Sequence, residues 1–191
     1  MEVTDKFYLF PPKPLYVPAN SEVFTKLDND TAWVGEVKKN GWRIMVRVNE
    51  EGELALWTRR KTIELQPLLN LRKALQELKL PPDTILDGEL LEHRGATKEH
   101  IMLWGMFRWA GEWLRSVPYK EIMWRMSFVP TNNYLSRPAY VFEGKKTFYE
   151  ELLRQSEENE GLVLKRLDAP VPFSFTACPD VRTWLKVKAN A

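Results

Sequence analysis

The sequence predicts an α+β fold in which antiparallel sheets are flanked by helices. Strand character begins at Trp33, and apolar residues alternate with polar ones from Trp42 to Val48. The loop 49–52 (NEEG) joins that run to a second strand-like segment, 53–58, as in a β-hairpin. Leucines at helical spacing between Leu68 and Leu80, ended by two prolines, indicate a helix. Because strands dominate and a hairpin is present, a purely parallel doubly wound sheet is not expected.

The remaining elements follow from local patterns along the chain. Residues 11–18 (PPKPLYVP) contain four prolines, which indicates an extended, hydrogen-bond-poor arm over the surface. Thr147 and Glu150 form a capping box, which predicts a helix that runs to about Asn159. A short helix is expected over 119–126, and further strands over 85–91, 102–109, 161–167 and 183–187.

The composition is that of a globular chain and excludes several classes of protein. With 191 residues, 44% of them hydrophobic, the chain can bury a core. The net charge of +2 argues against a histone-like polycation. One cysteine, Cys178, and two histidines, His93 and His100, are too few for a disulfide framework or a Cys- or His-built metal centre. Without a membrane-length apolar run or a secretory signal in residues 1–10, we expect a monomeric cytoplasmic protein that does not enter a membrane.

The first segment that could carry chemistry is 36–43 (EVKKNGWR). A strand ends at a lysine, a glycine follows three residues later, and the chain returns as another strand. A lysine amine is a nucleophile only when it is deprotonated, and Lys38 would lie at the mouth of such a turn. Gly41 would allow a sharp turn or a close backbone approach to a ligand. The alternative is an ordinary hairpin with solvated lysines.

Two further segments place carboxylates at strand ends. Asp87 and Glu89 lie at i and i+2, on one face of a strand, where an inward-facing pair requires a cation, a metal or ligand hydroxyls. Glu160 stands at the entry of the strand that carries Val163 and Lys165 on one face, where a carboxylate could hold Mg²⁺. The alternatives are a turn at Asp87 and a helix C-cap at Gly161.

Near the C-terminal end, Lys186 and Lys188 share one strand face, and two neighbouring ammonium groups suit a polyanion such as a nucleotide phosphate. The alternative is an exposed strand with one solvated face. Arg59 belongs to a cationic run that closes the hairpin. Trp104 could stack on a base, although a core role is as compatible with a chain that has eight tryptophans.

Together these segments resemble the nucleotidyltransferase domain of ATP-dependent DNA ligases, in the covalent nucleotidyltransferase superfamily that also contains RNA ligases and mRNA capping enzymes. Lys38 to Gly41 is similar to the nucleophile motif, usually Lys-x-Asp-Gly, and Trp104 stands where the family has an adenine-stacking aromatic. The other matches, each to a further family motif, are 58–59 (TR), 87–89 (DGE), 160–170 (EGLVLKRLDAP) and 184–188 (WLKVK). The resemblance covers about Glu36 to Lys188.

The resemblance implies a fold and an activity. It implies an ATP-grasp-like nucleotidyltransferase domain over 31–191 without an OB domain, and residues 1–30 as an N-terminal arm packed on it. Lys38 would attack the α-phosphate of ATP and release pyrophosphate. AMP would then pass to the 5′-phosphate of nicked duplex DNA, where a 3′-OH displaces it. The implied cofactors are ATP and Mg²⁺ (or Mn²⁺).

The resemblance also implies a role for each matched residue. Glu36 would read the adenine, Glu89 would hold the ribose, and Val163 would pack on the adenine face opposite Trp104. The implied catalytic residues are Lys38, Lys186 and Lys188. The implied nucleotide- or phosphate-binding residues are Glu36, Val37, Arg43, Arg59, Glu89, Trp104, Val163 and Lys165. The implied metal ligands are Glu160 and Asp87.

The chain differs from the family pattern at three points. Asn40 replaces the usual Asp of the nucleophile motif, and Gly105 replaces the Asp that usually follows the stacking aromatic. The sequence ends three residues after Lys188, where the family continues into an OB domain, so a separate OB-fold or DNA-binding protein is an expected partner. The alternatives are an RNA ligase of the same superfamily and a non-catalytic nucleic-acid-binding module. The tail after Lys165 favours the DNA branch.

Overall fold

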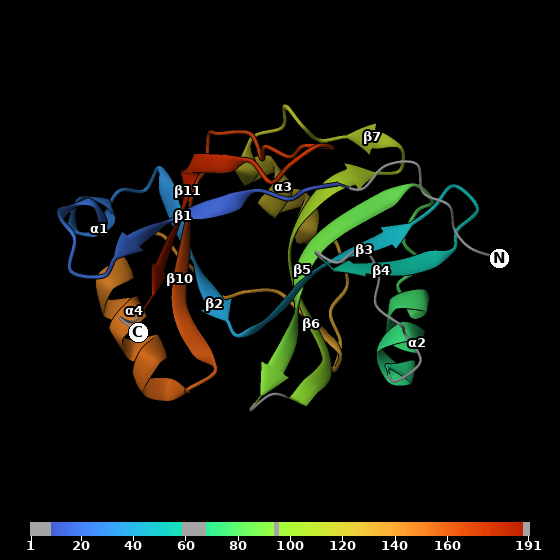
Figure 1. The fold of residues 1–191 in the computed structure, drawn as a ribbon, viewed down its shortest axis with the longest axis horizontal. Helices are drawn as coiled ribbons and strands as arrows, with labels where there is room; N and C mark the ends of the chain where they lie inside the picture. The colour runs from blue at the N-terminus through green and yellow to red at the C-terminus, as the bar shows by residue number, and fades with distance from the viewer. Residues whose placement is uncertain (1–8, 59–67, 94–95, 189–191) are drawn as a thin grey trace.

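The computed structural model describes residues 9–58, 68–93 and 96–188, and this part of the chain forms two mainly antiparallel sheets (Figure 1). The strands of the first sheet, in spatial order, are β1 (Lys13–Pro18), β11 (Asp180–Lys188), β10 (Asn159–Arg166), β2 (Trp33–Lys39) and β9 (Tyr140–Val141). Those of the second are β4 (Leu54–Thr58), β3 (Gly41–Val48), β5 (Thr84–His93), β6 (Ala96–Trp109) and β7 (Glu112–Trp113), with β8 (Leu135–Ser136) beside β6. Only β1–β11 and β6–β8 are parallel among the described pairs.

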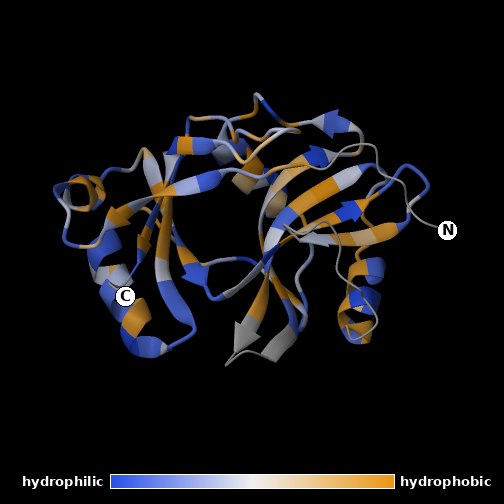
Figure 2. Cartoon of the chain, in the orientation of Figure 1, coloured by the Kyte–Doolittle hydropathy of each residue, from blue (hydrophilic) through white to orange (hydrophobic). Residues whose placement is uncertain are grey.

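Four helices lie outside the sheets in the described residues: α1 (Glu22–Leu27), α2 (Leu69–Glu77), α3 (Tyr119–Met126) and α4 (Lys145–Gln155). Helices α1 and α4 lie on one side of the molecule, against the first sheet, and α2 lies at the other side, beyond the second sheet (Figure 1). Figure 2 shows hydrophobic and hydrophilic residues side by side on α4, as expected for a helix that packs one face on a sheet. The predicted α+β architecture is therefore confirmed.

The predicted hairpin, the helix over 119–126 and the later strands are confirmed, with strand ends shifted by a few residues. Helix α2 ends earlier than Leu80 because Lys79 takes a positive φ of 48°, which breaks the helix before the prolines. The capping box at Thr147 is wrong, since α4 begins two residues earlier. There Asp28, far away in the sequence, accepts a 2.7 Å hydrogen bond from the Lys146 backbone N–H.

The proline-rich segment is not the hydrogen-bond-poor arm that its composition predicts. Residues Lys13–Pro18 form β1, an edge strand that pairs in parallel with β11. Edge strands tolerate proline because one row of backbone groups needs no partner. The possible β2–β3 hairpin is also excluded, since these strands belong to different sheets. Gly41 lies where they separate, and a Cβ there would come 2.3 Å from the Leu90 carbonyl oxygen, so the close approach is to β5 rather than to a ligand.

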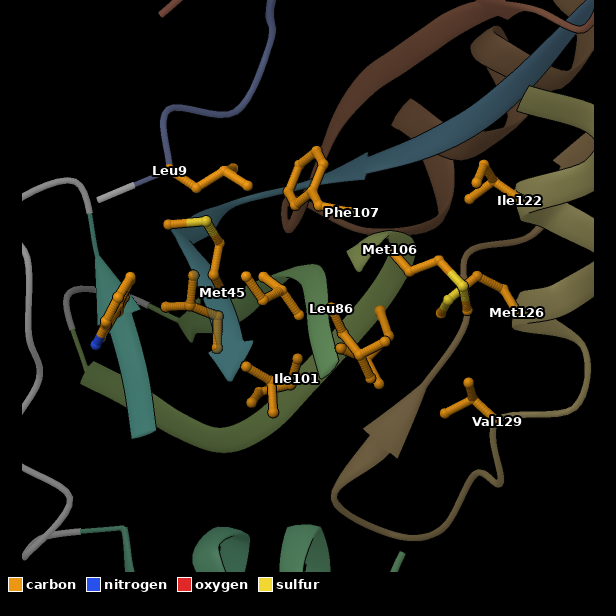
Figure 3. Close-up of a cluster of buried hydrophobic side chains, with 14 of the residues drawn as sticks. Leu9, Met45, Leu86, Ile101, Met106, Phe107, Ile122, Met126 and Val129 are labelled. Carbon is orange, nitrogen blue, oxygen red and sulfur yellow. The ribbon is translucent and has the colours of Figure 1, made fainter. Parts of the chain in front are cut away.

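Two hydrophobic clusters hold the sheets and helices together. The larger one joins the second sheet to α2 and α3, and Figure 3 shows Met106 of the sheet and Met126 of α3 with their side chains pointing toward one another. The smaller one packs the outer face of β2, β10 and β11 on α1 and α4. The inner face of those three strands is thereby left to face the second sheet. None of the helices in the described ranges is both long and apolar enough to cross a bilayer.

Candidate functional site

A cavity of about 570 Å³ lies between the two sheets, and its walls come from strands spread over most of the chain. Eleven of the residues predicted from the sequence line it: Glu36, Val37, Lys38, Arg43, Glu89, Trp104, Glu160, Val163, Lys165, Lys186 and Lys188. Asp87 is not among the lining residues. Arg59 lies outside the described residues.

Strand alternation explains why these side chains converge. On β11, Lys186 and Lys188 line the cavity, while Leu185 and Val187 between them are buried in the smaller core. On β10, Val163 lines the cavity by the same rule. The predicted placement of the two lysines on one strand face is therefore confirmed.

Glu160 reaches the cavity through an irregularity in β10. The pairing with β2 shifts between Asn159 and Gly161, so Glu160 is the extra residue of a β-bulge, a device that re-aims a side chain. Gly161 has a φ of 137°, and a Cβ on it would lie 2.0 Å from the Val187 carbonyl oxygen. Gly161 is thus required inside a strand, and the alternative of a helix C-cap at this position is wrong.

Two lysine ammonium groups meet at the carboxylate of Glu160. Lys188 Nζ lies 2.8 Å from Glu160 Oε2, and Lys38 Nζ forms an ion pair with the same oxygen. Burial raises the pKa of Glu160, but the hydrogen bonds from Lys188 and Lys38 outweigh that effect and leave the pKa below its ordinary value. The carboxylate is therefore ionised at neutral pH and holds the Lys38 amine at the cavity wall.

The deep end of the cavity contains a buried ion pair. Lys165 Nζ lies 2.7 Å from Glu36 Oε2, and both side chains are no more than 3% exposed. The Lys165 ammonium also lies over aromatic rings, 4.2 Å from the centroid of Trp184 and 5.9 Å from that of Trp104. Burial raises the pKa of Glu36 and lowers that of Lys165, while their mutual attraction opposes both shifts. A polar pair surrounded by indole rings offers a base both a hydrogen-bonding edge and a stacking surface.

Asp87 organises the wall instead of facing the cavity. It is 1% exposed and accepts two hydrogen bonds from Arg43, Nε at 2.9 Å and Nη2 at 2.6 Å. The Trp104 indole N–H donates to the same carboxylate at 2.9 Å. These bonds use both oxygens, so the prediction that Asp87 is a metal ligand is not supported by this arrangement. Asp87 fixes the orientation of Arg43 and Trp104.

Glu89 is a mostly buried carboxylate whose pKa is raised by burial despite two nearby cations. It lines the cavity at 9% exposure. Burial raises its pKa from 4.5 to about 7, although the charges of Lys38 and Arg43 favour the ionised form. Glu89 therefore changes protonation near neutral pH.

The cavity lining is strongly cationic, unlike the chain as a whole. Its cations are Lys13, Lys38, Lys39, Arg43, Lys165, Lys186 and Lys188, against the carboxylates Glu36, Glu89 and Glu160. Such an excess attracts a polyanion of the size of a nucleoside triphosphate. The described residues contain no group of three or more Asp, Glu, His or Cys that could hold a metal ion by themselves.

Sequence reasoning missed several residues of the site. Lys13 and Pro14 line the cavity because β1 pairs with β11, which the proline-rich composition hid. Trp184 lines it from the same strand face as Lys186, a position that period-two alternation could have indicated. Tyr119 reaches the Glu36–Lys165 pair from α3, and no sequence signal marks it.

Comparisons with known proteins bear on the fold. No family model matches the sequence, and no curated protein matches it. Among solved structures, mycobacterial DNA ligase D complexed with ATP and MES superimposes with a TM-score of 0.65 at 17% identity, over 94% of this chain and 60% of that one. The Lig E DNA ligase structure gives 0.59 at 14% identity, over 93% and 69%. An archaeal ATP-dependent RNA ligase gives 0.57 at 18% identity, over 94% and 48%.

These likenesses establish the fold. The chain has the fold of the nucleotidyltransferase domain of ATP-dependent ligases, as its motifs indicate. It spans 60% of the length of the mycobacterial ligase D structure and less than half of the archaeal RNA ligase.

Proposed function

We propose that this chain is the core of an ATP-dependent polynucleotide ligase, which adenylates itself on Lys38 and transfers AMP to the 5′-phosphate of nicked DNA before sealing. The observation that carries the proposal is the meeting of Lys38 and Lys188, from two separate strands, at the Glu160 carboxylate. This trio lies in a cationic cavity whose deep end holds Glu36 and Trp104. Adenylation of a lysine needs an amine nucleophile, cations that bind phosphate, and an aromatic recess that fits a base.

The first step joins the lysine to the nucleotide. Once its ammonium proton has passed to solvent, Nζ of Lys38 would form a bond to the α-phosphorus of ATP while the bond to the pyrophosphate oxygen breaks. Pyrophosphate leaves, and the nitrogen of the new phosphoamide loses its surplus proton to solvent. Because the pKa of Glu160 is lowered, its carboxylate is a weak base, so we assign to it the orientation of the amine. Lys186 and Lys188 would stabilise the negative charge that develops on the α-phosphate.

The later steps use the same wall of the cavity. A 5′-phosphate oxygen takes AMP from Lys38, and the 3′-OH of the nick then displaces AMP as the phosphodiester bond forms. Trp104 would stack on one face of the adenine and Val163 would pack on the other, with Glu36 at its edge and Val37 beside it. Glu89 would hold the ribose, and Lys165 would keep Glu36 ionised. Arg43, anchored by Asp87, would bind a phosphate.

Mg²⁺ or Mn²⁺ is part of this proposal. Glu160 is the carboxylate that would hold the ion, together with oxygens of the nucleotide phosphates. A bound ion would supply neutralisation of phosphate charge. This assignment is compatible with the preference of Mg²⁺ for oxygen ligands, with nucleotide phosphates and water completing its coordination.

The domain arrangement is also proposed. We assign residues 31–191 to an ATP-grasp-like nucleotidyltransferase domain and residues 1–30 to an arm packed on it, an assignment that the pairing of β1 with β11 supports. A separate OB-fold or DNA-binding protein that orients the pyrophosphate stays a prediction. A second candidate function, RNA ligation, is favoured by the archaeal RNA ligase among the similar structures.

The test is self-adenylation. The protein is incubated with ATP and Mg²⁺, and intact mass spectrometry is used to look for one added AMP. We expect the adduct in the parent and in Lys39→Ala, the matched neighbouring lysine, and none in Lys38→Ala. Absence of the adduct from the parent, or its persistence in Lys38→Ala, refutes the proposal. Sealing of nicked DNA compared with nicked RNA, both with a 5′-phosphate, then decides the substrate.

A further inference from the structure

Tyr119 is a buried tyrosine that joins three separate parts of the deep end of the cavity. It lies at the start of α3 and is 0% exposed. Its hydroxyl donates a hydrogen bond to Glu36 Oε1 and accepts one from Lys165 Nζ at 3.0 Å. The hydroxyl oxygen also lies 3.1 Å from the carbonyl oxygen of Trp104. One phenol thus contacts Glu36, which would read a base, its ion-pair partner Lys165, and the backbone of Trp104, which would stack on the base.

The donors available around Glu36 determine whether its carboxylate can accept or donate a hydrogen bond. A phenol has one proton, and an ionised carboxylate is a stronger acceptor than a peptide carbonyl, so the proton belongs to the bond with Glu36. Lys165 occupies the other carboxylate oxygen. Both oxygens of Glu36 therefore receive donors from the protein, and each retains lone-pair capacity toward the cavity. In this state Glu36 can accept a hydrogen bond from a ligand but cannot donate one.

We propose that Tyr119 is a positioning residue that keeps Glu36 an acceptor-only carboxylate and thereby selects a base with an exocyclic amine over a base with a carbonyl at the same position. This inference rests on the proposed function, since it concerns the nucleotide that Lys38 would attack. The matching ligand is an adenine nucleotide, whose 6-amino group donates. The rejected ligand is a hypoxanthine nucleotide, whose 6-oxo group places an acceptor against the carboxylate.

The surroundings of Glu36 explain why a single phenol matters. Burial raises the pKa of Glu36, whereas Lys165 on β10 and Tyr119 on α3 favour its ionised form. The other titratable groups that act on it are Asp87 on β5 and Tyr140 on β9. Loss of the Tyr119 hydroxyl removes a stabilising bond from the charged form. A protonated Glu36 could donate to a 6-oxo group, and discrimination against hypoxanthine would fall.

The experiment compares single-turnover adduct formation with ATP and with ITP, measured by intact mass. We expect Tyr119→Phe to lower the ratio of the ATP rate to the ITP rate at least about tenfold, because a hydrogen bond to a charged group is at stake. Tyr149→Phe is the matched control, since Tyr149 is buried in the smaller core away from the cavity. That control should leave the ratio unchanged. A purely structural role for Tyr119 would lower the thermal stability and both rates but not their ratio.

The outcomes separate the two proposals. If the parent forms no adduct with either nucleotide, the proposed function fails, and this inference with it. If the adduct forms and the ratio in Tyr119→Phe stays within about twofold of the parent, only the role of Tyr119 is overturned. If Tyr119→Phe does not fold, Tyr119 is replaced by 3-fluorotyrosine, which keeps the shape and donates more strongly. The pH at which the ATP to ITP ratio begins to fall on acidification should then be lower than in the parent, and an unchanged pH profile of the ratio overturns the inference.

Discussion

Replacing Glu89 by glutamine is expected to stabilise the folded protein, and more at pH 8 than at pH 5. Burial raises the pKa of Glu89 from 4.5 to about 7, so the folded state holds this proton more tightly than the unfolded state. The stability that the proton contributes is complete below about pH 4.5 and is lost as the pH rises through about 7. Glutamine imitates the protonated side chain at every pH and removes that loss.

The magnitude follows from the size of the shift. A rise from 4.5 to about 7 corresponds to about 3 kcal/mol of folding free energy at pH 8 and about 1 kcal/mol at pH 5. Since Glu89 is only 9% exposed, solvent screens this effect little. Urea unfolding of the parent and of Glu89→Gln at both pH values measures it, with the exposed Glu151→Gln on α4 as the control. Equal differences between parent and variant at pH 5 and pH 8 would refute the reasoning.

Three further predictions concern the backbone, the cations and the buried pair. Gly161→Ala should destabilise the fold by about 3 kcal/mol in urea unfolding, because its φ of 137° and the adjacent backbone of β11 leave no place for a Cβ. Lys186→Ala should slow adduct formation about 100-fold in a single-turnover assay, and Lys39→Ala far less, because Lys186 is assigned to the developing charge on the α-phosphate and Lys39 is not. Lys165→Met should cost about 3–5 kcal/mol by leaving Glu36 buried and unpaired, and adding Glu36→Gln should recover part of that loss in a double-mutant cycle.

Each of these predictions has a result that contradicts it. Gly52→Ala is the backbone control, since Gly52 also has a positive φ, 82°, but nothing lies within 4 Å of a Cβ there. If Gly52→Ala lost as much stability as Gly161→Ala, the loss could not be due to a steric clash of the Cβ. Equal slowing by Lys186→Ala and Lys39→Ala would mean that the nucleophile motif is misaligned by one residue. Strict additivity of the Glu36 and Lys165 changes would mean that the pair is not coupled.

Local patterns in the sequence were sufficient for much of the fold, and the resemblance to ligase motifs supplied most of the candidate site. Turn residues and period-two alternation predicted the β3–β4 hairpin, and alternation alone put Lys186 and Lys188 on one strand face. The resemblance to ligase motifs implied that Lys38 and Glu160 belong to one site, and the two side chains form an ion pair. These features are set by near neighbours along the chain or by recurrent spacing, so one sequence contains the information.

Other features depended on partners far away in the sequence. Asp28 caps α4 across more than a hundred residues and moves the start of that helix away from the capping box. Asp87 bonds to Arg43 and Trp104 instead of facing the cavity, because the pairing of β3, β5 and β6 brings these residues together. Tyr119 reaches Glu36 only because α3 packs behind β6.

The sequence by itself determined which residues carry charge and, on a regular strand such as β11, which face each one occupies, because side-chain alternation is a property of the local backbone. The tertiary structure decided which of those charged side chains meet in the cavity and which, like Arg43 and Asp87, form a mostly buried ion pair in its wall. It also decided which chain segment, β1 with Lys13, completes the cavity. Contacts between distant segments depend on how whole sheets pack, and no local pattern in the chain encodes them.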